Sequence, residues 1–171
     1  GGSTGIALDY YASPEIGEND FSEQTEEGIY CTIGSAPYIW GNDFSTMGGA
    51  AISCSSEPVI ENNTITDCTT GISVTGEALV IGNSISGCQV GIESHDGNAE
   101  ITGNFLTEND HGVYLNDTAG SVHTNLLVAN ETGVMVVGGI TDFIYNEVSE
   151  TPDVLHNTII GSTGYGVMLD A

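Results

Sequence analysis

Acidic and histidine side chains gather in one part of the chain, between residues 93 and 117. The members of this acidic–histidine cluster are Glu93, His95, Asp96, Asp110, His111 and Asp117. Carboxylates and imidazoles can exchange protons with a bound sugar, and carboxylate oxygens are the ligands that Ca²⁺ prefers. Three alternatives stay open: solvated loop residues, a cation site made by Asp96, Asp110 and Asp117, and acid–base work on a neutral glycan.

The charge of the chain restricts its partners. Its 171 residues include 24 acidic residues and no lysine or arginine, which gives a formal net charge of −24. We expect no nucleic-acid partner, because phosphate backbones are bound by cations. No apolar run is long enough to cross a bilayer, so we expect no membrane insertion. The expected partners are cations, with calcium as a candidate cofactor.

A repeat of about 21 residues runs through almost the whole chain. Asparagines return at nearly constant spacing, as Asn19, Asn42, Asn63, Asn83, Asn104 and Asn125. An apolar residue stands two positions after each of them and another stands three positions before. A third apolar column starts at the residue directly after the repeated glycines, and a second inward column lies two residues further along the same strand. Since a spacing of two keeps residues on one face of a strand, each repeat holds three short strands, and stacked repeats share one core.

Two segments carry a resemblance to a known family. The segments NTITDCTTGISV (63–74) and NSISGCQVGIES (83–94) resemble the repeat of the pectin-lyase-like superfamily, whose fold is a right-handed parallel β-helix. The resemblance covers roughly residues 5–169. It predicts an all-β solenoid of about seven turns, with about 21 residues and three short strands per turn, as a single domain over residues 1–171. It also implies an inward ladder of Asn63, Asn83, Asn104 and Asn125.

The glycines and one irregular spacing complete the prediction of the fold. Gly71, Gly91, Gly112 and Gly133 begin the next strand of their turns, where we expect a tight bend that suits glycine. The spacing lengthens once, between Gly133 and Gly166. We therefore expect a loop insertion at 145–153, and either Asn146 or Asn157 can continue the ladder.

Enzymes of the superfamily that this chain resembles act on acidic polysaccharides, and most of their catalytic elements are missing from this sequence. Pectate lyases of this type use arginine or lysine as the base, and the chain has neither. Of the four polygalacturonase elements only the His-Gly element is present, at His111-Gly112. We therefore expect a non-catalytic member with no catalytic residue.

The strands that begin with a glycine also have an outward-facing column, and this column contains the other candidate binding residues. Tyr30 and Tyr114 point outward there, and so does Glu93, close to His95. Tyrosines are common on exposed strands, but they can also serve as platforms for sugars. Tyr30, Glu93, His95 and Tyr114 are therefore candidate carbohydrate-binding residues.

The cysteines form two stacked pairs. Cys31 and Cys54 share one inward column on neighbouring turns, and Cys68 and Cys88 share another. Adjacent strands lie about 4.8 Å apart, which is within reach of a disulfide. Packed thiols and disulfides that join successive turns both stay open.

Three glycosylation sequons begin at Asn62, Asn116 and Asn130. Such sequons are modified in secreted proteins, and we take Asn62 and Asn116 as the candidate sites. Together with the absence of trypsin cleavage sites, they favour an extracellular or cell-surface location.

The two ends of the sequence correspond closely. The segment GSTGIALD (2–9) matches GSTGYGVMLD (161–170) apart from two inserted residues. The last turn is thus expected to fit the first turn of another copy, and such head-to-tail contacts build open filaments. We predict a structural extracellular β-helix subunit that stacks into a filament or stalk. The alternatives are a segment of a longer covalent solenoid and a carbohydrate-binding or carbohydrate-modifying β-helix.

Overall fold

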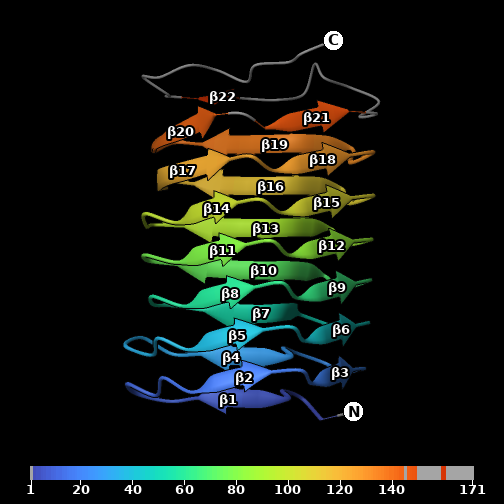
Figure 1. Cartoon of the computed structure of the whole chain (residues 1–171), viewed down its shortest axis with the longest axis vertical. Coiled ribbons are helices and arrows are strands. Elements are labelled where there is room, and N and C mark those ends of the chain that lie inside the picture. The colour runs from blue at the N-terminus through green and yellow to red at the C-terminus, as the bar shows by residue number, and fades with distance from the viewer. Residues whose placement is uncertain (1, 145, 150–158, 161–171) are drawn as a thin grey trace.

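The computed structural model describes residues 2–144, 146–149 and 159–160. Its strands lie one above another in a tall stack (Figure 1) and form three sheets. The first sheet contains β1 (Ile6–Leu8), β4 (Ile29–Cys31), β7 (Ala50–Cys54), β10 (Thr70–Thr75), β13 (Val90–His95), β16 (His111–Asn116), β19 (Thr132–Val137) and β22 (Ile159–Ile160).

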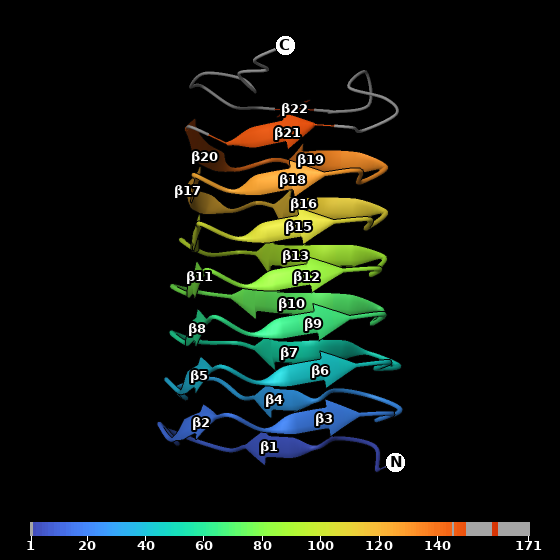
Figure 2. The same cartoon turned by 45° about the vertical axis from the view of Figure 1, so that its right-hand side comes forward.

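The other two sheets have seven strands each, and in Figure 2 the third sheet comes toward the viewer. The second sheet contains β2 (Glu15–Gly17), β5 (Tyr38–Trp40), β8 (Val59–Glu61), β11 (Leu79–Ile81), β14 (Glu100–Thr102), β17 (Ala119–His123) and β20 (Ile140–Ile144). The third sheet contains β3 (Asp20–Ser22), β6 (Asp43–Ser45), β9 (Thr64–Thr66), β12 (Ser84–Ser86), β15 (Phe105–Thr107), β18 (Leu126–Val128) and β21 (Glu147–Ser149).

Every strand pairs in parallel with the equivalent strand of the next circuit. Ile29 is paired with Ile52, for example, and Ile52 with Ile72. Six such steps of about 21 residues separate β1 from β19. The prediction of an all-β solenoid with three short strands per turn is therefore confirmed, and the described residues contain no helix.

The core contains one column of apolar side chains from each sheet, and the first sheet adds a second inward column two residues further on. All of the following are buried: Ile29, Ile52, Ile72, Ile92 and Val113 of the first sheet, Ile39, Ile60, Val80, Ile101 and Val122 of the second, and Phe44, Ile65, Ile85, Leu106 and Leu127 of the third. β-Branched residues predominate because they fit a pleated surface. Burying one such side chain fully is worth about 1.5–3 kcal/mol, so the columns supply the main force that holds the circuits together.

An asparagine ladder runs along the corner between the second and third sheets. The Oδ1 atom of Asn83 accepts hydrogen bonds from the backbone N of Asn63 at 2.9 Å and from its Nδ2 at 3.0 Å. The Nδ2 atom of Asn83 donates in turn to Ile60 O and to Asn104 Oδ1. The same bonds recur at each rung, which confirms the predicted ladder of Asn63, Asn83, Asn104 and Asn125 and extends it to Asn19, Asn42 and Asn146.

The ladder also bears on the expected loop insertion at 145–153. Asn146 Oδ1 accepts from Asn125 N and Nδ2, so Asn146 is the rung that follows Asn125. Residues 147–149 then form β21, which pairs with β18. That part of the expected loop is therefore a strand, and residues 145 and 150–153 lie outside the described residues.

The glycines that begin the strands of the first sheet are needed for a reason other than the expected bend. Gly91 and Gly112 lie inside β13 and β16 and are not among the residues with positive φ. A Cβ atom on Gly91 would lie 2.6 Å from Gly112 O and 3.1 Å from Leu106 Cδ2. Close packing on the next circuit, and not a tight turn, therefore excludes a side chain here.

Candidate functional site

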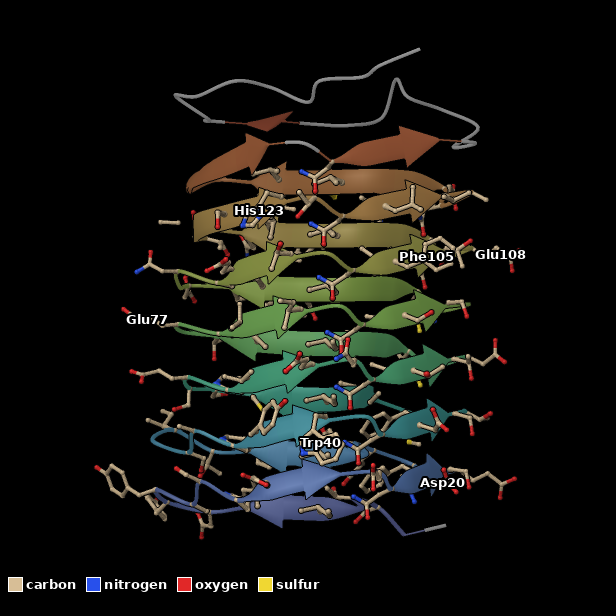
Figure 3. The ribbon with its side chains drawn as sticks, viewed as in Figure 1. Asp20, Trp40, Glu77, Phe105, Glu108 and His123 are labelled. Carbon is tan, nitrogen blue, oxygen red and sulfur yellow. The ribbon has the colours of Figure 1, made fainter. Side chains whose placement is uncertain are left out.

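The outward face of the first sheet differs from circuit to circuit. Its outward column reads Ala7, Tyr30, Ser53, Ser73, Glu93, Tyr114 and Met135 in register. The inward columns are almost entirely apolar, whereas this column combines small, aromatic and acidic residues with one methionine. Other acidic side chains point outward elsewhere, such as Glu77 and Glu108 at opposite margins of the stack (Figure 3). A specific site therefore has to be formed by a local group of side chains on the outward surface.

Three of the four predicted carbohydrate-binding residues come together on β13 and β16. His95 Nε2 lies 2.7 Å from Glu93 Oε1, and the centroids of the His95 and Tyr114 rings lie 5.9 Å apart. His95 Nδ1 also lies 3.4 Å from Asn116 Nδ2. This arrangement offers one carboxylate, one imidazole and one aromatic ring to a ligand. Glycoside hydrolysis typically needs a second facing carboxylate, which these contacts do not supply.

The fourth predicted residue, Tyr30, does not join this group. Tyr30 lies on β4, and β7 and β10 separate β4 from β13. Three strand spacings correspond to about 14 Å. Tyr30 therefore shares the outward face of the sheet with the other three candidates but not their close contacts, and carbohydrate binding by these residues stays a prediction.

The predicted cation site of Asp96, Asp110 and Asp117 is also not formed. Asp96 follows β13 and Asp117 follows β16, so these two occupy equivalent turns of neighbouring circuits. Asp110 precedes β16, and the six residues of that strand span about 20 Å. Among the residues that the structure describes, no three acidic, cysteine or histidine side chains are grouped to hold a metal ion.

The three sequons differ in their accessibility. The Asn62 side chain is exposed and its Nδ2 donates to Glu61 Oε1. Asn116 is half-buried beside His95. Asn130 is fully buried and its Nδ2 donates to Leu106 O at 2.8 Å. Asn62 is the most accessible candidate, and the fold removes Asn130 from the surface.

All four cysteines are buried thiols in the structure. Cys31 and Cys54 are Cα partners on β4 and β7. A hydrogen bond with Cys31, together with burial, raises the pKa of the Cys54 thiol well above its usual value. A hydrogen bond with Cys68 and burial likewise raise the pKa of Cys88. The stacking of both pairs agrees with the prediction, and disulfides between turns stay a prediction.

The column of Cys68 and Cys88 continues as a second asparagine ladder that the sequence analysis missed. The backbone N of Cys88 donates to Asn109 Oδ1 at 2.9 Å, and Asn109 Nδ2 donates to Asn130 Oδ1 at 3.0 Å. The signal was present in the sequence, because each of these residues stands five positions after a rung of the first ladder.

An exposed aromatic group near the start of the chain was missed as well. Tyr10 and Tyr11 follow β1 and are 77% and 81% exposed, and Ile33, after β4, is 77% exposed. With Tyr30, Thr32 and Ser55, the side chains of Tyr10 and Ile33 line an open cavity of about 250 Å³. The adjacent tyrosines directly after a predicted strand were the signal.

The fold and its outward face define a parallel β-solenoid of three-stranded circuits. The family model described as "right handed beta helix region" matches residues 4–149, and the chain belongs to that family. Among curated proteins and solved structures, none matches this chain. In the part of the chain that the structure describes, no helix has the length and apolar character of a membrane span.

Proposed function

We propose that the chain is a non-catalytic structural β-helix of the extracellular space or cell surface, and that copies of it stack end to end into a filament or stalk. The observation that carries this proposal is the first circuit. Strands β1, β2 and β3 are terminal in their sheets, and within the described residues no strand pairs with their outer edges. Unpaired parallel edges are templates for another chain.

The backbone of β1 directs unpaired groups along the solenoid axis. Ile6 N donates to Gly28 O, and Leu8 O accepts from Thr32 N. Alternate residues of a strand direct their backbone groups to opposite neighbours. The N–H and C=O groups of Ala7 therefore face away from β4, toward the position that a strand of another copy would occupy in the proposed filament.

The asparagine ladder gives the stack a polarity that suits head-to-tail contact. Each inner rung accepts two hydrogen bonds at Oδ1 from the rung before it, as Asn42 does from Asn19. Within the described residues, Asn19 Oδ1 has no such donor. The first circuit thus presents an acceptor at the point where a preceding rung would present N–H donors. The matching segment 161–170 lies outside the described residues.

Apolar burial at the open end supports the same contact. Ile6 and Leu8 are only partly buried and pack on the core cluster. Covering them with another circuit would remove apolar surface from water, at about 25 cal/mol per Å². The net charge of −24 opposes the approach of two copies, so we expect stacking to need salt or divalent cations that screen the repulsion.

Electron microscopy of the chain at high salt tests this function. We expect fibres with an axial repeat of about 34 Å, which corresponds to seven circuits at about 4.8 Å each. Ala7→Pro removes the N–H group that faces the open edge, and we expect it to abolish the fibres. Ala7→Val keeps this N–H group and is the matched control. Folded monomers of the unaltered chain at every salt concentration would refute the proposal.

A second candidate function is carbohydrate binding on the outward face. The observation that favours it is the grouping of Glu93 and His95 with the Tyr114 ring. Aromatic rings and a few placed polar groups are typical of ligand sites. Discrete monomers that bind a glycan through Tyr114 would favour this function over the filament.

A further inference from the structure

The cavity beside Tyr30 spans three successive circuits at one end of the first sheet. Tyr10 follows β1, Thr32 and Ile33 follow β4, and Ser55 follows β7. These side chains and Tyr30 line an open volume of about 250 Å³. We call it the tyrosine cavity. It combines aromatic and aliphatic walls with the hydroxyl groups of Thr32 and Ser55, a composition typical of small-ligand sites.

The rings at this cavity are exposed and held by a constrained backbone. Tyr10 is 77% exposed and has φ 23°, and Tyr11 has φ 58°. Aromatic residues seldom adopt positive φ, and this segment has two of them in succession in that conformation. Tyr10 N donates to Asp9 Oδ1 at 3.1 Å and to Thr32 Oγ1 at 3.2 Å. These bonds attach the strained segment to the end of β4 and fix the position of Tyr10.

Charge decides which kind of ligand this cavity suits. The chain has no lysine or arginine and a net charge of −24, so its field repels anions and concentrates cations. The Asp9 carboxylate stands directly beside the cavity, because it accepts hydrogen bonds from Tyr10 N and Thr32 Oγ1. The faces of tyrosine rings carry partial negative charge and attract cations within about 6 Å.

We propose that the tyrosine cavity binds a small organic cation with an alkylated ammonium group. The faces of Tyr10 and Tyr30 receive the positive charge, Ile33 contacts the alkyl groups, and Asp9 adds long-range attraction. A metal ion lacks the apolar surface that Ile33 and the rings would cover. A simple alkylammonium ion has that surface together with a diffuse charge, and it needs no hydrogen-bond acceptor. The argument for this site does not rest on the proposed filament.

Calorimetric titration of the whole chain with choline tests the proposal. The comparison ligand is the uncharged carbon isostere of choline, in which a tert-butyl group replaces trimethylammonium. We expect choline to bind in the millimolar range and the isostere to bind at least about fivefold more weakly, since a cation–π contact at an exposed site is modest. Equal binding of both ligands would show an apolar site and overturn the proposal.

Substitutions that leave the net charge unchanged separate the cavity from general attraction to carboxylates. Tyr10→Leu removes one aromatic face, and we expect choline to bind about fivefold more weakly. Tyr10→Phe keeps the face and the affinity. Tyr11→Leu is the matched control, because Tyr11 is equally exposed but does not line the cavity. Equal affinity in Tyr10→Leu and Tyr11→Leu, or displacement of choline by a neutral methyl glycoside, would overturn the assignment.

Discussion

At the scale of single residues, a ladder asparagine bonds backbone groups of neighbouring circuits at the corner between two sheets. Asn83 Nδ2 donates to Ile60 O at 2.9 Å, and its Oδ1 atom accepts from Asn63 N. Asn63 N lies at the corner between β8 and β9, whereas Ile60 lies within β8, so the side chain of Asn83 connects a strand to the corner that follows it. Since a buried polar group without a partner costs about 1–3 kcal/mol, each rung contributes by keeping its corner fully bonded.

The hydrogen bonds of Asn83 predict the effect of removing one inner rung of the ladder. Asn83→Ala leaves Ile60 O and Asn63 N without their side-chain partners, and we expect it to lower the free energy of unfolding by about 3 kcal/mol. Urea denaturation followed by circular dichroism measures the loss.

Asn62, which precedes the ladder residue Asn63, provides the control. Asn62 is exposed and has φ 53°, so Asn62→Gly keeps a backbone that glycine adopts readily. We expect its stability to stay within about 0.5 kcal/mol of the unaltered chain. Equal losses at the two positions would show that the ladder is not the source of the stability.

The sequence predicted inward residues better than outward residues, for a physical reason. An inward position must fit the same neighbours on every circuit, so its residue type recurs and forms a visible column. Outward positions such as Tyr30 and Glu93 meet water and are free to vary. Their distances depend on which circuits they occupy, and for that reason the sequence showed neither that Tyr30 lies apart from Glu93 nor that the three aspartates are not grouped.

At the scale of the strands, the fit between neighbouring circuits depends on glycine in the first sheet. Gly91 lies in β13, which pairs with β16 on one side and β10 on the other. A Cβ atom on Gly91 would lie 2.6 Å from Gly112 O, which is backbone and cannot move without shifting β16. The glycine column therefore sets how closely the circuits approach.

Adding one methyl group at this position tests the packing. We expect Gly91→Ala to destabilise the chain by about 1–3 kcal/mol, the usual cost of overpacking. Gly2→Ala is the control, because the nearest atom to its added Cβ would be Thr4 O at an ordinary 3.8 Å. Thermal unfolding measures both changes, and unchanged stability in Gly91→Ala would contradict the contact.

Strand positions were predictable from sequence, whereas the role of these glycines was not. A two-residue period identifies a strand without knowledge of its neighbours. The close approach of Gly112 O becomes visible only when two circuits are placed in register. The beginning of the expected loop at 145–153 was wrong for a similar reason. That prediction rested on the long spacing between Gly133 and Gly166, whereas Asn146 and β21 continue the regular pairing.

At the scale of the whole molecule, acidic charge without any compensating cation opposes the compact state. The chain carries a formal net charge of −24. In the described part, a histidine ring lies against a carboxylate in two places, His95 at Glu93 and His123 at Glu100. Self-repulsion of this kind is weakened by dissolved salt, because the screening length falls from about 30 Å at 0.01 M to about 3 Å at 1 M.

We therefore expect the stability of the monomer to rise with ionic strength. The midpoint of urea unfolding should increase between about 0.01 and 1 M sodium chloride, by on the order of 1 kcal/mol in free energy. Potassium chloride is the control and should act equally, since screening does not depend on the identity of the cation. A midpoint independent of salt would show that the repulsion is negligible.

The unbroken parallel register has a consequence for how such a protein changes over generations. Each circuit pairs only with the circuit below and the circuit above. Duplication or deletion of one 21-residue unit would therefore lengthen or shorten the rod by a single interstrand step, about 4.8 Å, and leave its cross-section as it was. The length of the solenoid therefore changes by whole circuits, and substitutions on its outward surface can occur independently of that length.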